Sequence, residues 1–382
     1  MASLRNPPLS LYVHLPWCVK KCPYCDFNSH PLRGGLPEPE YLAALLRDLD
    51  EELARIPGRA IETVFFGGGT PSLFSADAIG RVLDATGGHL AGDAEITLEA
   101  NPGTVEHGAF AAYRAAGVNR LSLGAQSFDA AALTRLGRIH GPDEIALAVG
   151  EIDAAGFDNF NLDLMYGLPD QTLAGALDDI ERAVALKPAH ISHYQLTLEP
   201  QTAFARRPPP LPDDDAIWEM QRTCQAALAN AGFRQYETSA YARSGRQCRH
   251  NLNYWQYGDY LGIGAGAHGK LTHGPEVLRR AKLRHPTRYR GAAGHAKAFT
   301  ENAVDGDDRV FEFMLNALRL NAGFDRTLFE SRTGCDLARA EAPLALAMDK
   351  GLLARDGERY YPTDRGRAWL NDLQALFLPE AA

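Results

Sequence analysis

The fold and chemistry of this chain are indicated first by one segment near its start, Tyr12-Val13-His14-Leu15-Pro16-Trp17-Cys18-Val19-Lys20-Lys21-Cys22-Pro23-Tyr24-Cys25-Asp26-Phe27. A short β-branched and aromatic run leads into three of the chain's six cysteines, at C-x3-C-x2-C spacing. Four thiolates complete an iron–sulfur cubane or a structural zinc site, whereas three on one loop leave a position open for another ligand. We therefore predict a [4Fe–4S] cluster with one exchangeable iron. A zinc loop with a distant fourth ligand and cysteines without any metal are the alternatives.

This spacing, with an aromatic residue before the last cysteine, resembles the signature of the radical S-adenosylmethionine proteins. The resemblance implies that Cys18, Cys22 and Cys25 bind the cluster. It also implies that the open iron binds the amino and carboxylate groups of S-adenosylmethionine, and that the reduced cluster splits this cofactor to give a 5′-deoxyadenosyl radical.

The composition is typical of a globular protein with one large domain and a smaller one, at 382 residues with 45% hydrophobic and 23% charged residues. No run approaches the roughly 18 apolar residues of a membrane span, and the first residues lack a signal peptide's apolar region. Cys224, Cys248 and Cys335 are scattered singly, which favours a reducing compartment over a disulfide framework. We expect a cytoplasmic protein, and a net charge of −9 argues against nucleic acid as a partner.

Apolar runs of strand type alternate with helical patterns from residue 9 to about residue 198, which is typical of βα units around a parallel sheet. The predicted strands lie near 10–15, 61–66, 95–100, 120–125, 159–166 and 190–198. The predicted helices lie near 38–56, 75–86, 104–116, 142–155 and 171–187. Six such strands predict an α/β fold, a partial (β/α)6 barrel of TIM type, whose site lies at the carboxyl ends of the strands.

Glycine or polar residues follow four of these strands. Gly67 to Gly69 let the backbone approach a ligand closely, and Thr70 comes next. Glu99 can accept hydrogen bonds from ribose hydroxyls or an ammonium group, although such a carboxylate can also cap the following helix. Because these strand ends share one rim of the barrel, we expect a common site that includes Gly68, Thr70, Glu99, Gln126, Arg138 and Asp163.

The order of these motifs resembles that of the oxygen-independent coproporphyrinogen III oxidase-like proteins along nearly the whole chain. The resemblance implies two S-adenosylmethionine sites, lined by Tyr12, Gly68, Thr70, Glu99, Gln126, Arg138 and Asp163, with further contacts from Tyr24 and Gly69. The chain departs from the oxidase at Phe27, where the oxidase has a fourth cysteine. Its Arg249-His250-Asn251-Leu252-Asn253-Tyr254-Trp255 fits the H-N-x-x-Y-W pattern of a heme chaperone branch of the subfamily.

That branch implies a protein that holds heme and passes it to acceptor proteins. Imidazole is a common ligand of heme iron, and aromatic side chains can pack on a macrocycle. His250 is the first candidate ligand, with Cys248 and His14 as rivals. The alternative is that the motif forms a packed corner of the fold.

The segment after the predicted barrel has three further features. A proline-rich connection ends at Asp213, before a helical pattern at 214–231 and a strand-like pattern at 233–241. The small residues of 261–269 are expected to cover the barrel mouth, and they lack the βαβ context of a dinucleotide site. Basic residues between Arg279 and Arg290 are predicted to form a solvated face, with heme propionates or an acidic partner as the alternative.

The last 80 or so residues have the pattern of a second domain. Helical patterns at 310–320, 326–332 and 337–350 precede a hairpin signal, Asp356-Gly357, and a last helix. This order resembles a winged-helix module. Residues 301–382 carry 15 acidic against 10 basic residues, which opposes DNA binding, so we expect this α+β domain to cover the barrel or bind a protein.

The sequence therefore predicts three segments: a radical S-adenosylmethionine core at 1–235, a barrel-covering segment at 236–298 and a winged-helix-like domain at 299–382. The expected function is a heme chaperone that carries [4Fe–4S] and S-adenosylmethionine, whose redox state gates heme release. The alternatives are an oxygen-independent coproporphyrinogen III oxidase and a cluster-bearing electron-transfer protein. Expected partners are heme, heme-acceptor proteins and a heme or electron donor, with the chain a monomer or homodimer.

Overall fold

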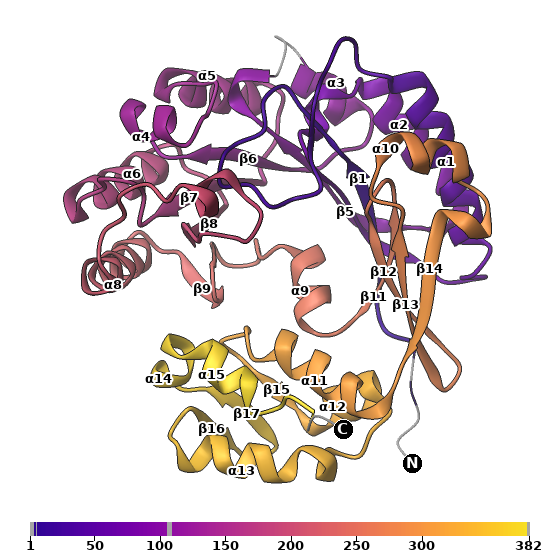
Figure 1. Ribbon diagram of the computed structural model, residues 1–382, viewed down its shortest axis with the longest axis vertical. Helices are drawn as coiled ribbons and strands as arrows, with labels where there is room; N and C mark the ends of the chain where they lie inside the picture. The colour runs from indigo at the N-terminus through magenta and orange to yellow at the C-terminus, as the bar shows by residue number, and fades with distance from the viewer. Residues whose placement is uncertain (1–3, 5, 105–108, 380–382) are drawn as a thin grey trace.

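The computed structural model describes residues 4, 6–104 and 109–379, and its centre is one curved sheet. Six parallel strands form the middle of this sheet in chain order: β1 (Leu9–Leu15), β4 (Ile61–Gly68), β5 (Leu90–Ala100), β6 (Arg120–Gln126), β7 (Phe160–Tyr166) and β8 (His190–Gln195). All six predicted strands are present. Figure 1 shows the sheet as an arc that stays open on one side, so the prediction of a partial barrel is confirmed.

Helices cover the outer side of this arc (Figure 1). They are α1 (Glu38–Leu53), α2 (Ala76–Ala85), α3 (Ala109–Ala115), α4 (Ala130–Arg135), α5 (Pro142–Ala154), α6 (Leu173–Ala185) and α8 (Asp214–Asn230). Short 3-10 turns lie at η1 (Pro71–Leu73), η2 (Gly87–His89) and η3 (Pro102–Thr104). Residues 105–108 of the predicted helix 104–116 lie outside the described residues. The sequence patterns missed α4, a six-residue helix whose N-terminus is capped by the Asp129 side chain, which accepts from the Ala132 N–H at 2.6 Å.

Side chains alternate between the two faces of the central strands. The outer-facing set, such as Leu11, Val64, Leu98 and Leu121, is fully buried and packs in the main hydrophobic core with the helices. The inner-facing set is polar on nearly every strand. The inner side of the arc can therefore hold polar ligands, while the outer side supplies the burial that stabilises the fold.

The sheet continues beyond β8 and beyond β1. Next to β8 lie two short antiparallel strands, β10 (Ala240–Ala242) and β9 (Arg234–Glu237), where one strand was predicted at 233–241. Next to β1 lie the parallel β11 (Asp259–Ile263) and then the antiparallel β12 (His268–His273), β13 (Glu276–Lys282) and β14 (Phe299–Val304). Helices α7 (Ala203–Arg206), α9 (Arg249–Trp255) and α10 (Pro286–Ala292), with η4 (Ala296–Ala298), lie in the connections.

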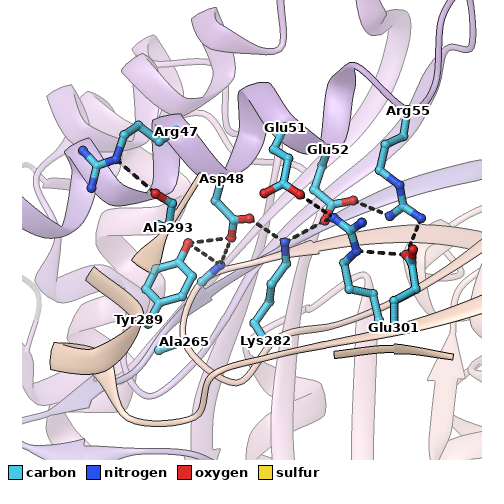
Figure 2. Close-up of polar contacts among 12 residues, drawn as sticks. Arg47, Asp48, Glu51, Glu52, Arg55, Ala265, Lys282, Tyr289, Ala293 and Glu301 are labelled. Atoms are coloured by element: carbon cyan, nitrogen blue, oxygen red, sulfur yellow. Dashed lines mark hydrogen bonds and ion pairs between the residues drawn. The ribbon is translucent and has the colours of Figure 1, made fainter. Parts of the chain in front are cut away.

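Two expectations for this region can be compared with the structure. Residues 261–269 form β11 and its turn into β12, and a Cβ at Gly262 would lie 1.9 Å from the His268 carbonyl oxygen. The small residues thus permit close backbone packing, and their covering of the barrel mouth stays a prediction. The solvated basic face is correct only in part: Arg284 and Arg288 are exposed, whereas Arg280 and Lys282 of β13 are buried and form ion pairs with α1. Figure 2 shows the Lys282 ammonium beside Asp48 and Glu52.

The C-terminal residues form a separate hydrophobic core around Phe313, Phe324 and Phe329. Its elements are α11 (Gly306–Ala317), β15 (Phe324–Asp325), α12 (Arg326–Thr333), η5 (Leu337–Ala340), α13 (Glu341–Asp349), β16 (Leu353–Asp356), β17 (Arg359–Pro362), α14 (Asp364–Ala368) and α15 (Leu370–Ala375). The predicted hairpin at Asp356-Gly357 is present. The boundaries at 235 and 298 stay a prediction, since the sheet itself runs through both.

The C-terminal domain lies opposite the sheet, on the open side of the arc, with α9 between them (Figure 1). Arg319 joins the three parts: its guanidinium carbon lies 4.3 Å from the Trp255 ring centre, and it pairs with Glu237 at 3.0 Å. Tyr257 donates to Glu312 at 2.6 Å in the same region. The C-terminal domain therefore lies over the open side of the barrel. This agrees with the first of the two roles expected for it, covering the barrel or binding a protein.

Candidate functional site

The cysteine loop is fixed in place by contacts of its backbone and of its other side chains, and its three cysteines form no disulfide. It runs from β1 through the pair β2 (Trp17–Cys18) and β3 (His30–Pro31). Lys21 donates to the carbonyl groups of Phe27 and Ser29 at 3.0 and 3.1 Å, and Asn28 donates to that of Ala265 at 2.8 Å. All three loop cysteines are free and partly exposed. The loop therefore presents three thiols from a well-supported backbone.

These thiols fit a cluster better than a single metal ion. Among the described residues, no three His, Cys, Asp or Glu side chains converge on one ion. A cubane binds each thiolate through a different iron and does not need such convergence. Arg138 donates to the Cys22 sulfur at 3.8 Å. Burial raises the pKa of the Cys18 and Cys25 thiols, so binding of a cluster would release protons there.

An outer cavity of about 660 Å³ lies beside the three cysteines at the carboxyl ends of the strands. Its lining includes eight of the predicted cofactor residues: Tyr24, Gly68, Gly69, Thr70, Glu99, Gln126, Arg138 and Asp163. Residues from four strands and from the loop are thus brought together, as the rim argument predicted. The other two predicted residues, Tyr12 and His250, line a different cavity of about 200 Å³, which we call the inner chamber.

The glycine run after β4 has a steric cause. Gly68 has φ of +117°, and a Cβ there would lie 2.5 Å from the His14 ring. A Cβ at Gly69 would lie 2.5 Å from the Trp17 carbonyl oxygen. Glycine therefore lets the strand end pass directly against the cysteine loop, and the Gly68 N–H donates to Glu99 at 3.1 Å.

The carboxyl groups of Glu99 and Asp163 face the cavity together. Burial, and then the nearby Asp163 charge, raise the pKa of Glu99 to about 8, while the Gly68 N–H opposes this. Burial also raises the pKa of Asp163, although Asn161 and Ser122 donate to it. The pair therefore favours a ligand that brings a positive charge or hydrogen-bond donors.

Replacing Glu99 with glutamine should stabilise the cluster-free chain at high pH. In the unfolded chain Glu99 ionises near its ordinary pKa, whereas in the fold it stays protonated to about pH 8, so the wild type loses stability as pH rises between those values. The variant avoids this loss, which is about 4 kcal/mol at pH 8 and little at pH 4. Thermal unfolding at both pH values measures it, with the exposed Glu181→Gln as control. An equal effect at both pH values would contradict the argument.

Arg138 is held at the rim by residues that the sequence did not single out as a set. It donates to the Asn101 amide oxygen at 2.6 Å and to the Gly124 carbonyl at 2.7 Å. Gln126 has a left-handed φ of +70°, which is uncommon for a residue with a side chain. The two hydrogen bonds of Arg138 to Asn101 and Gly124 hold its guanidinium between Cys22 and the strand ends.

His250 lies in helix α9, of which it and Asn253 are the buried residues, and it is 1% exposed. Its Nδ1 lies 2.7 Å from the Thr63 hydroxyl and its Nε2 lies 3.0 Å from the Tyr254 hydroxyl, while its ring stacks on Phe65. Both ring nitrogens have hydrogen-bond partners in this arrangement. The H-N-x-x-Y-W motif is thus packed into the fold here, and ligation of heme by His250 stays a prediction.

The two rival heme ligands are also engaged. His14 contacts the Tyr12 hydroxyl at 2.9 Å and the Asn28 carbonyl at 3.0 Å. Cys248 is 1% exposed, and its thiol donates to Glu95 at 3.6 Å. The sequence reasoning also missed the polar inner face, including Arg120, Asn161, His190 and Ser192. Alternation of polar with apolar residues along each strand is the signal that could have found it.

Comparisons with known proteins agree with this geometry. The family model of the radical SAM superfamily matches residues 12–183, and that of the HemN C-terminal domain matches 304–369. The heme chaperone HemW of Escherichia coli is 50% identical, with 99% of this chain and all of that protein covered. HemW of Haemophilus influenzae is 48% identical, over 98% of this chain and 99% of that protein.

A solved structure shares the fold. Coproporphyrinogen III oxidase HemN from Escherichia coli superposes with a TM-score of 0.82 at 24% identity, covering 97% of this chain and 90% of that one. No helix in the described part of the chain is long and apolar enough to cross a membrane. The full-length likeness, with three free cysteines and the strand-end residues around one cavity, shows that this chain belongs to the HemW family of radical SAM proteins.

Proposed function

We propose that this chain is a heme chaperone, which binds heme and transfers it to acceptor proteins in the cytoplasm. The observation that carries the proposal is the 50% identity to a protein named as a heme chaperone, over 99% of this chain. The six free cysteines support a reducing compartment. A separate donor of heme or of electrons, and a monomer or homodimer, remain part of the proposal.

The proposal includes two further cofactors. Cys18, Cys22 and Cys25 would hold the [4Fe–4S] cluster. Tyr24, Gly68, Gly69, Thr70, Glu99, Gln126, Arg138 and Asp163 would hold S-adenosylmethionine in the outer cavity, with Tyr12 behind them in the inner chamber. The cluster, when bound, supplies an electron to S-adenosylmethionine. The chain's own residues orient that cofactor: Glu99 and Asp163 offer acceptors, and Arg138 offers donors.

Heme binding is tested by titrating the anaerobically reconstituted chain with hemin while following the Soret band. We expect saturation near one heme per chain, and transfer of the bound heme to an apo acceptor protein on mixing. The same sample should form no product from coproporphyrinogen III. Turnover of that substrate without saturable heme binding would refute the chaperone and support the oxidase.

The packing of His250 adds a second expectation to this titration. Since both ring nitrogens are engaged in the fold, His250→Ala should lower the thermal stability of the chain and leave the position of the Soret band unchanged. A shifted or lost Soret band in a variant that keeps its fold would mean that helix α9 rearranges to bring His250 to iron.

A further inference from the structure

The inner chamber is a polar cavity of about 200 Å³ enclosed by the sheet and by α9. Helix α9 contributes His250, Asn251 and Tyr254 to its lining. The remaining lining residues come from the strands: Tyr12, Phe65, Glu99, Arg120, Ser122, Asn161, Asp163, His190, Ser192 and Tyr194. Glu99, Ser122, Asp163 and Tyr194 also line the outer cavity, so the two spaces share one wall.

Arg120 is a buried cation of this chamber. It is the first residue of β6 and is 2% exposed, and its side chain lines the chamber. Burial opposes its charge, but nearby groups, among them Glu95 and Asp163, outweigh burial and raise its pKa, so Arg120 is charged. Its buried Nε nevertheless has no hydrogen-bond partner, which leaves a donor for the carboxylate of a ligand.

Asp163 and Glu95, whose charges act on Arg120, also accept hydrogen bonds from other groups. Asp163 accepts from Ser122 at 3.0 Å on one oxygen, and from Asn161 and Tyr194 at 2.9 and 3.2 Å on the other. Glu95 Oε1 accepts from the His250 backbone N–H at 3.2 Å and from the Cys248 thiol at 3.6 Å. Thus no carboxylate among the described residues forms the two parallel hydrogen bonds with the Arg120 guanidinium that this group favours.

We infer that the inner chamber is a carboxylate-binding site in which Arg120 pairs with a carboxylate of a bound ligand. The chamber has room for a short carboxylate arm and not for a porphyrin ring. If the chain holds heme, as proposed above, that arm is a heme propionate and the ring takes the place of S-adenosylmethionine in the outer cavity, so the two ligands exclude each other. A small free carboxylate has the same chemistry and is the other source.

The test compares hemin with its dimethyl ester, whose propionates carry no charge, on reconstituted protein without added S-adenosylmethionine. Wild type should bind hemin about tenfold to hundredfold more tightly than the ester, which is the range for a hydrogen bond to a charged group. Arg120→Met should bind both with the weaker affinity, whereas Arg120→Lys should keep part of the preference. The exposed Arg326→Met serves as control.

A second measurement does not depend on heme. Added propionate should raise the unfolding temperature of wild type and of Arg326→Met, and leave that of Arg120→Met unchanged. This measurement also reports whether each variant is folded.

The outcomes separate this inference from the proposed function. If Arg120→Met binds hemin and its dimethyl ester with the same affinities as wild type, and propionate does not raise the unfolding temperature, the carboxylate site is overturned. The heme chaperone proposal is then unaffected. If propionate raises the unfolding temperature of wild type but not of Arg120→Met, the carboxylate site is supported. If the same chain binds no hemin, the heme chaperone proposal is refuted.

Discussion

Serine in place of Cys22 is expected to abolish the iron–sulfur cluster. Only three thiols line the outer cavity, and all three are free. A hydroxyl is a poor ligand for iron in this setting because it is not deprotonated near neutral pH, so the variant would have two thiolates for a cluster that already lacks a fourth. Iron and sulfide measured after anaerobic reconstitution should fall from about four of each per chain to near none.

The matched control is Cys335→Ser in the C-terminal domain. The Cys335 thiol donates to the Gly306 carbonyl at 3.6 Å, a contact that a serine hydroxyl can also make. This variant should keep the full iron content and the stability of the wild type. Retention of a full cluster by Cys22→Ser would mean that another side chain supplies a ligand, and the assignment of the loop cysteines would then be wrong.

The central strands were predictable from sequence because each is a run of strand-forming residues that stands apart from its neighbours. Leu9–Leu15 and Phe160–Tyr166 are examples, and their ends were placed within a residue or two. The residues at the rim could be predicted from these strands, because the carboxyl ends of parallel strands lie at the same edge of the sheet. The cysteine loop was predictable for a different reason, because its spacing is local and does not depend on the fold.

Other features depend on contacts between residues far apart in the chain. Thr63 and His250 are 187 residues apart, and no local pattern indicates that their side chains meet. The H-N-x-x-Y-W motif therefore suggested a heme ligand, although the structure gives it the packing of α9. That the Arg120 Nε lacks a hydrogen-bond partner is likewise decided by the side chains around the whole chamber, and not by the residues next to Arg120 in the sequence.

The basic residues of β13 illustrate the same difficulty. A cluster of arginine and lysine is usually exposed, and nothing nearby in sequence contradicts that. Their partners Asp48 and Glu52 lie more than two hundred residues earlier, on α1. The register of α1 against β13 decides that these charges are buried together, and that register is set by the folded sheet.

Methionine in place of Lys282 is therefore expected to cost about 3–5 kcal/mol of folding free energy. Figure 2 shows the Lys282 ammonium between two carboxylates, 2.5 Å from Asp48 and 2.6 Å from Glu52. Lys282 is 4% exposed, and Asp48 and Glu52 are 0% and 1% exposed. Removing the ammonium leaves Asp48 as a buried negative charge that, among the described residues, keeps the Tyr289 hydroxyl and the Gly264 N–H as its donors. Glu52 keeps its ion pairs with Arg55 and Arg280.

The size of this loss should depend on pH in one direction. Burial raises the pKa of Asp48 even with Lys282 present, whereas Lys282 and then Arg280 outweigh burial and lower that of Glu52. Without Lys282 both pKa values rise, so the fold can neutralise these groups as pH falls. The deficit of Lys282→Met is thus largest near pH 8 and shrinks toward pH 5. Urea unfolding at both pH values measures it.

Two further variants show whether the unpaired charge is the cause. The exposed Lys297→Met makes the same chemical change on the surface and should stay within about 0.5 kcal/mol of wild type. Adding Asp48→Asn to Lys282→Met removes the unpaired Asp48 charge and should restore a substantial part of the loss at pH 8. If the double variant is as unstable as the sum of the two single variants, the cost lies in lost packing of the lysine chain between α1 and β13, and the electrostatic account of this interface is wrong.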